Sequence, residues 1–218
     1  MTELIAPRGD DEILDFDEDA LRLKPIMTGD VFVDVPVTGE ATPIAVMVAG
    51  HPCTIRRGAE LKPRIPCVRL LEHQWVPYHA WPRQSHGCFP ISEAVGIGQG
   101  QCGTLDDWVT VDAGELARER RRLTLQDRGV LVFQQRLIHS LSRFVTPIDA
   151  LHEASRHVLV EAELEYDWVF ELDGTAPLDS LIADFAGFMD AEDRRAVLRK
   201  DDRRVRAELK AELRSRAA

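Results

Sequence analysis

The stretch GDVFVDVPVTGEATPIAVMV, residues 29–48, decides the fold class of this 218-residue chain. Valines occupy every second position from 31 to 37, and this period of two predicts a β-strand. Residues 38–40 predict a turn, because they centre on a glycine between polar residues. Residues 44–49 form a continuous apolar run between a proline and a glycine, which predicts a central strand buried on both faces.

Outward from this stretch, the pattern changes from strands to helices near residue 113. Further short strands are predicted at residues 64–71, 75–81 and 108–111. Apolar residues then recur at helical spacing over residues 124–144. Short strands with tight turns favour a small barrel or a curled sheet. We therefore expect an α+β fold, with an SH3-like β-barrel domain over residues 22–112 and a mostly helical region over residues 113–218.

The two ends of the chain are strongly charged. Residues 1–21 contain eight acidic residues and few bases, which predicts an acidic flexible leader. Residues 190–218 carry ten basic and seven acidic residues around a narrow apolar stripe. Such a stripe predicts a projecting charged C-terminal helix. This helix is either stabilised by ion pairs between side chains four residues apart or docked on a protein partner.

The overall composition excludes several classes of protein. With 44% hydrophobic and 29% charged residues, the chain is neither a disordered nor a collagen-like protein. Its formal net charge of -10 repels nucleic acid at long range, so an RNA-binding role needs a local basic patch. The longest apolar runs are far too short to span a bilayer, and the N-terminus lacks a secretory pattern. We expect a cytoplasmic protein without a membrane partner.

Several catalytic motifs are missing from the sequence. It contains no G-x-S-x-G, H-E-x-x-H or G-x-x-x-x-G-K-[ST] pattern, so lipase-like, zincin and P-loop NTPase functions lose their main support. Residues 98–103 match G-x-G-x-x-G literally. A dinucleotide site needs an apolar strand before this motif and a helix after it, and neither is predicted here. We therefore expect a flexible loop.

Two His-x-Cys units offer a candidate zinc site. His51 with Cys53, and His86 with Cys88, together supply two imidazoles and two thiols, a complete tetrahedral set. The one-residue spacing is tighter than that of zinc knuckles, and Pro52 restricts strand pairing. We therefore expect no metal and no other cofactor, with His51 capping a turn and Cys53 packing as a small hydrophobe. A Cys–His nucleophile pair is the remaining alternative.

The best basic cluster follows the central strand. Arg56, Arg57 and Arg64 lie close to aromatic residues that include Trp81. Guanidinium groups beside aromatic platforms suit single-stranded RNA, because they contact phosphates while the rings stack on bases. The alternative is a set of ordinary surface arginines balanced by the acidic leader.

Residues 29–34 and 43–48 together resemble the opening of the MazF/PemK toxin family. In that family a strand beginning Gly-Asp-Ile/Val is followed by an apolar strand led by proline, and the resemblance covers about residues 25–70. It implies an SH3-like barrel and mRNA interferase activity in a bacterial toxin–antitoxin pair. Two departures stand out: Ala41-Thr42 replace the arginine usual before Pro43, and Pro66-Cys67 stand where a threonine or serine is expected.

These features predict a toxin-like or RNA-binding protein. The expected substrate-binding residues are Arg56, Arg57, Arg64 and Trp81. If the protein cleaves RNA as an endoribonuclease, His51 is the expected catalytic base, since histidine titrates near neutrality. The alternative is a non-catalytic interaction or regulatory protein that recruits a partner through residues 190–218.

Overall fold

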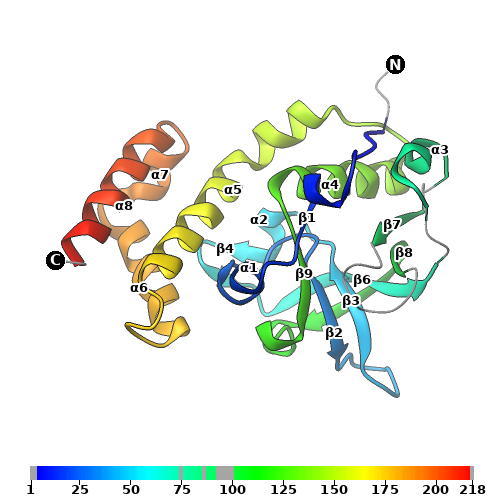
Figure 1. Cartoon of the computed structure of the whole chain (residues 1–218), viewed down its shortest axis with the longest axis horizontal. Helices are drawn as coiled ribbons and strands as arrows, with labels where there is room; N and C mark the ends of the chain where they lie inside the picture. Colours follow the sequence, from blue (N-terminus) through cyan, green and yellow to red (C-terminus); the bar gives the residue numbers. More distant parts are fainter. Residues whose placement is uncertain (1–3, 74–75, 85–86, 92–100, 217–218) are drawn as a thin grey trace.

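A seven-stranded antiparallel sheet forms the centre of the protein (Figure 1). The computed structural model describes residues 4–73, 76–84, 87–91 and 101–216. The strands lie in the order β1-β9-β2-β3-β6-β8-β7, and a separate hairpin pairs β4 with β5. The bounds are β1 Leu14–Asp15, β2 Val31–Val35, β3 Ile44–Val48, β4 Arg56–Arg57, β5 Glu60–Leu61, β6 Arg64–Glu72, β7 Cys88–Ile91, β8 Gln101–Asp112 and β9 Arg121–Leu125.

Helices dominate the second half of the chain. They are α1 Glu18–Leu23, α2 Pro52–Ile55, α3 Trp81–Gln84, α4 Asp127–Ser142, α5 Ile148–Glu171, α6 Leu178–Asp190, α7 Arg194–Leu198 and α8 Asp202–Arg216. Short 3-10 turns lie at η1 Asp10–Glu12, η2 Tyr78–Ala80, η4 Ala113–Glu115, η5 Arg118–Arg120 and η6 Ala191–Asp193. None of the helices in the described ranges is long and apolar enough to cross a membrane. The α+β class expected from the sequence is confirmed.

Strand β3 is the middle strand of the sheet and is buried on both faces, as its apolar run predicts. Met47 belongs to the hydrophobic cluster under α4, whereas Val46 and Val48 belong to a second cluster on the opposite face. Alternate side chains of a strand point to opposite faces, so a strand covered on both sides has no position for a polar residue. The sheet is open, because its edge strands β1 and β7 do not pair with each other in the described residues.

Several boundaries differ from those expected. Residues 4–21 are not a separate leader: β1 pairs with β9, and Ile13 and Leu14 are buried. Strand β9 lies within the region expected to be helical, because its pairing with β2 and β1 is a long-range contact that local periodicity does not reveal. The strand expected over residues 75–81 is wrong, since residues 78–84 are helical. The strand β7 was missed. In the G-x-G-x-x-G segment, residues 101–103 begin strand β8 and not a loop, whereas residues 98–100 lie outside the described residues.

The C-terminal helix does not project. In Figure 1, α6, α7 and α8 pack together beside the end of α5. Val205 and Leu209 of α8 are 0% and 1% exposed, within a cluster that includes Trp168 and Phe185. The narrow apolar stripe is therefore sufficient, because it docks on the chain's own helices. The expected pairs four residues apart do occur, including Arg204 with Glu208 at 2.8 Å.

A buried guanidinium joins the N-terminal segment to the sheet. Arg121 of β9 donates to Asp30 Oδ2 at 2.9 Å, and both side chains are 0% exposed. The same guanidinium donates to the carbonyl oxygens of Leu21 at 2.8 Å, through Nε, and of Lys24 at 2.9 Å. These carbonyls lie at the end of α1, where a cation is stabilising. Gly29, at φ 92°, makes the turn that leads Asp30 to this position.

We predict that Arg121→Met destabilises the protein by about 3–5 kcal/mol, because it leaves Asp30 charged and unpaired in the interior. The free energy of unfolding should be measured by urea denaturation with tryptophan fluorescence. Arg122→Met is the matched control, since Arg122 is the exposed neighbour in the same strand. We expect the control to change stability by less than about 0.5 kcal/mol. Equal losses in the two variants would show that the buried pair has no special role.

Candidate functional site

A cleft lies between the β4–β5 hairpin and helices α5, α6 and α7. Its volume is about 630 Å³. Cys53, Arg57 and Glu60 line one side, and His157, Arg195 and Arg199 are among the residues on the other. Gly58 forms the hairpin turn at φ 62°, and a Cβ at this position would lie 2.7 Å from Arg195 Nη2. Glycine therefore lets the hairpin approach α7 closely.

Arg56 lies behind the cleft, and its guanidinium is already used. The side chain is 4% exposed and is ion-paired with Glu165 of α5, which is 1% exposed. It also donates to the carbonyl oxygens of Ile26 and Gly58, both at 3.2 Å. Arg56 therefore joins the hairpin to α5 and is not available in this structure to clamp a phosphate.

Two other arginines face the cleft without an ion-pair partner. Within the described residues, no acidic group lies within salt-bridge distance of Arg57 or Arg199, and both are exposed. Arg195 is different, because it pairs with Glu161 at 2.9 Å and with Asp190. Glu60 lies opposite Arg57 in the hairpin and partly offsets its charge. Among the residues that the structure describes, the cleft thus presents two guanidinium groups without an ion-pair partner and three carboxylates, of which Glu161 and Asp190 share Arg195.

Trp81 and Arg64 lie away from this cleft. Trp81 is 0% exposed, donates through Nε1 to the Val76 carbonyl at 2.9 Å and packs against Phe89. Helix α3 lies beside β7, on the opposite side of the molecule from β4 (Figure 1). Arg64 is exposed at the start of β6, opposite Asp112. Of the four residues expected to bind substrate, Arg56 and Arg57 line the cleft, whereas Arg64 and Trp81 do not, and Trp81 is a core residue.

His51 caps α2, which agrees with the turn-capping role expected from the sequence. Its Nδ1 accepts from the Cys53 amide at 3.2 Å, so Nδ1 carries no proton. Nε2 then carries the proton and donates to Ser155 Oγ at 3.2 Å, and Ser155 donates to Gln134 Oε1 at 3.3 Å. Burial, together with the charge of His157, lowers the pKa of His51. Both ring nitrogens are engaged, so the general-base role expected for His51 has no free nitrogen in this structure.

Cys53 meets a histidine that the sequence did not pair with it. Its Sγ lies 3.9 Å from Nε2 of His157, one of the side chains along α5. Burial raises the pKa of the Cys53 thiol, despite the opposing charges of Lys62 and Arg199. A nucleophilic cysteine needs a lowered pKa, so this thiol–imidazole contact is not an activated pair.

The four-residue zinc set considered from the sequence is not assembled. Cys53 contacts His157, whereas Cys88 contacts His73 at 3.9 Å, from Sγ to Nε2. His51 and Cys53 lie at α2, and Cys88 begins the edge strand β7. His86 lies outside the described residues.

Sequence reasoning missed the side of the cleft formed by the helices. His157 lies on α5, a helix whose limits were not recognised, and Arg199 follows α7 in the segment expected to project. A search for helical periodicity over residues 148–171 could have placed His157 on a helix, but not beside Cys53. No protein-family model matches the chain, and a search of curated proteins finds no match.

We predict that Cys53 reacts slowly with iodoacetamide at neutral pH, because its raised pKa leaves little thiolate. The rate should keep rising as the pH increases past 9, and mass spectrometry of the Cys53 peptide measures it. Cys53→Ser identifies the labelled site. A rate that is already at its plateau at pH 7 would contradict this prediction.

We predict that His51 makes stability depend on pH. Its ordinary pKa is 6.5, and the folded state lowers it, so the unfolded chain binds the proton first as the pH falls. The stabilisation is therefore present above pH 6.5 and is lost as the pH falls from 6.5 towards the lowered folded value. His51→Asn is the control, because asparagine caps a helix but does not titrate. Urea denaturation at pH 7.5 and pH 5 should show a larger acid-induced loss in the unmodified protein than in His51→Asn.

Proposed function

We propose that the protein is a MazF/PemK-like, toxin-type protein that binds single-stranded RNA. The cleft between the β4–β5 hairpin and helices α5, α6 and α7 would hold the phosphodiester backbone. The observation that carries the proposal is the pair of exposed guanidinium groups, Arg57 and Arg199, which line one cleft and have no acidic partner within the described residues. Guanidinium groups recognise phosphates with two parallel hydrogen bonds. Two arginines on opposite sides of a cleft can contact successive phosphates of one strand.

The sheet topology supports the SH3-like part of this proposal. Five neighbouring strands of the sheet lie in the order β9-β2-β3-β6-β8. Strand β9, the last of the five along the chain, therefore pairs with β2, the first along the chain. The 3-10 turn η5 precedes that last strand. This is the order expected of a five-stranded SH3-like barrel. Side chains from the inner face, such as Phe32, Val46 and Ile65, pack on one another in a single cluster.

The proposal is for binding and does not include cleavage by His51. The ring of His51 serves as a helix cap and donor to Ser155. Base stacking on Trp81 is not included either, because that ring is buried. The competing idea of a partner recruited by the C-terminal helix has lost its support, since the apolar stripe of α8 is covered by α5 and α6.

Because the protein carries a net negative charge, we expect RNA binding to depend on direct arginine–phosphate contacts rather than on long-range attraction. The net charge of -10 repels RNA at a distance. At about 0.15 M salt the screening length is about 8 Å, so remote carboxylates contribute little once the arginines touch phosphates. Glu60 is close enough to Arg57 to oppose binding directly.

We predict that Arg57→Ala and Arg199→Ala each weaken binding of a labelled, unstructured oligoribonucleotide about tenfold, because each removes a charged contact to phosphate. Fluorescence anisotropy measures the affinity. Each variant should also flatten the dependence of log affinity on log salt concentration by about 0.7 per lost contact.

Two matched variants sharpen this test. Arg203→Ala removes one exposed positive charge from α8, outside the cleft, and should leave the affinity unchanged. Glu60→Gln removes the opposing carboxylate and should tighten binding. If all three arginine variants weaken binding equally, only the net charge matters and the cleft is not the RNA site. Undetectable binding by the unmodified protein rejects the function itself.

A further inference from the structure

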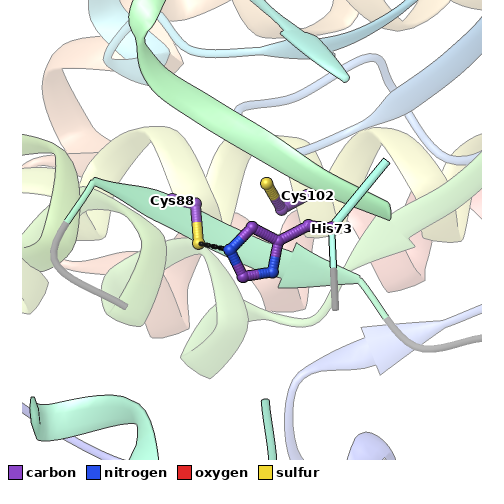
Figure 2. Close-up of side chains that lie close together, drawn as sticks. All are labelled: His73, Cys88 and Cys102. Atoms are coloured by element: carbon purple, nitrogen blue, oxygen red, sulfur yellow. Dashed lines mark hydrogen bonds between the residues drawn. The ribbon is translucent and has the colours of Figure 1, made fainter. Parts of the chain in front are cut away.

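A second cluster of reactive side chains lies at the edge of the sheet formed by β6, β8 and β7. His73 directly follows β6, Cys88 is the first residue of β7, and Cys102 is the second residue of β8. Figure 2 shows Cys88 Sγ turned towards the imidazole ring of His73, with the side chain of Cys102 beside them. Strands β6, β8 and β7 are neighbours at one edge of the sheet, so three segments that are distant in sequence supply one group each.

The strand register explains why the three side chains share a face. Cys88 is paired with Thr104, two residues from Cys102, so the two cysteines are diagonal neighbours on one face. Leu71 is paired with Cys102, and His73 lies two residues beyond Leu71. Because side chains alternate along a strand, His73 continues on the same side as Leu71 and Cys102. The sheet therefore sets the positions of Cys88 and Cys102, whereas His73 lies in the segment that directly follows β6.

The spacing of the donor atoms fits one small metal ion. One donor atom from each residue lies within 4.8 Å of the other two, and Cys88 Sγ is 3.9 Å from His73 Nε2. A tetrahedral zinc ion, with bonds of about 2.3 Å to sulfur and 2.0–2.1 Å to nitrogen, separates its ligand atoms by about 3.5–3.8 Å. Movements of a few tenths of an ångström up to about 1 Å, within the reach of side-chain rotation, close this set around a metal.

The chemistry of the three donors selects the type of metal. Two thiolates and one imidazole favour zinc over magnesium or calcium, which prefer oxygen ligands. Cys88 and Cys102 are 7% and 3% exposed, whereas His73 is exposed, so the site has a dry side and an open side. The guanidinium of Arg136 on α4, which is buried, interacts electrostatically with Cys88.

We propose that His73, Cys88 and Cys102 form a zinc-binding site. These described residues fill three of the four positions of a tetrahedral ion, and the exposed side at His73 admits water or another ligand to the fourth. The set shares only Cys88 with the His-x-Cys set considered from the sequence. The proposal departs from the expectation that the protein binds no metal, because that expectation compared residues by their spacing along the chain rather than across strands.

The test is a titration of the purified, reduced full-length protein with Zn²⁺ and with Co²⁺ as a spectroscopic probe. We expect about one equivalent of metal to bind, with Co²⁺ giving the visible bands of a tetrahedral site and a thiolate-to-metal charge-transfer band. His73→Ala and Cys102→Ser should each weaken binding at least about 100-fold, since even the loss of an outer partner costs 10–100-fold. Because His73 is exposed, we expect His73→Ala to fold even if Cys102→Ser, which alters a buried residue, does not.

Cys53→Ser is the matched control, because Cys53 is a thiol beside a histidine but lies outside this cluster. It should bind Zn²⁺ with unchanged affinity and give the same Co²⁺ spectrum. The proposal is overturned if no thiolate-to-cobalt band appears, or if His73→Ala binds metal as tightly as the unmodified protein. A disulfide between Cys88 and Cys102 that persists in the reduced preparation would also overturn it, since it assigns the pair to redox chemistry instead.

Discussion

The buried guanidinium of Arg121 is the interaction on which the rest of the structure depends. It neutralises Asp30 and also binds carbonyl oxygens at the end of α1, so one side chain holds the N-terminal segment, the entry to β2 and strand β9 together. Arg118 reinforces the same end of α1 with three carbonyl contacts, and its burial lowers its pKa to about 10, so it stays cationic at neutral pH. Unpaired, any of these charges would cost several kcal/mol in the interior.

A second buried ion pair, between Arg56 and Glu165, connects the β4–β5 hairpin to helix α5. It places the β4–β5 hairpin against α5, and the docking of α7 and α8 on α5 and α6 then creates the opposite wall of the cleft. The cleft therefore results from two packing arrangements. The first buries the Arg56–Glu165 ion pair, and the second buries apolar side chains of the C-terminal helices. Arg57 and Arg199 line this cleft and are exposed.

The environment, rather than the residue type, decides what each histidine and cysteine does here. His51 is held as a neutral helix cap by its two hydrogen bonds, and Cys53 keeps its proton because burial raises its pKa. Cys88 and Cys102 lie on adjacent strands, whose pairing sets their separation, and His73 directly follows the neighbouring strand β6. Histidine and cysteine thus have a structural role at α2, whereas beside β7 and β8 the same residue types have the spacing of metal ligands.

The sequence by itself determined the α+β class, the doubly buried strand β3 and the capping role of His51, because these depend on local periodicity or on residues two positions apart. Only the tertiary structure decided that β9 is a strand, that α8 docks rather than projects, and that Arg56 and Trp81 are buried. Several of these outcomes depend on contacts between residues far apart in the sequence, such as Arg56 with Glu165 or Val31 with Leu123. Local patterns carry no record of such partners, so the chemistry of both sites became visible only once the strands and helices were placed.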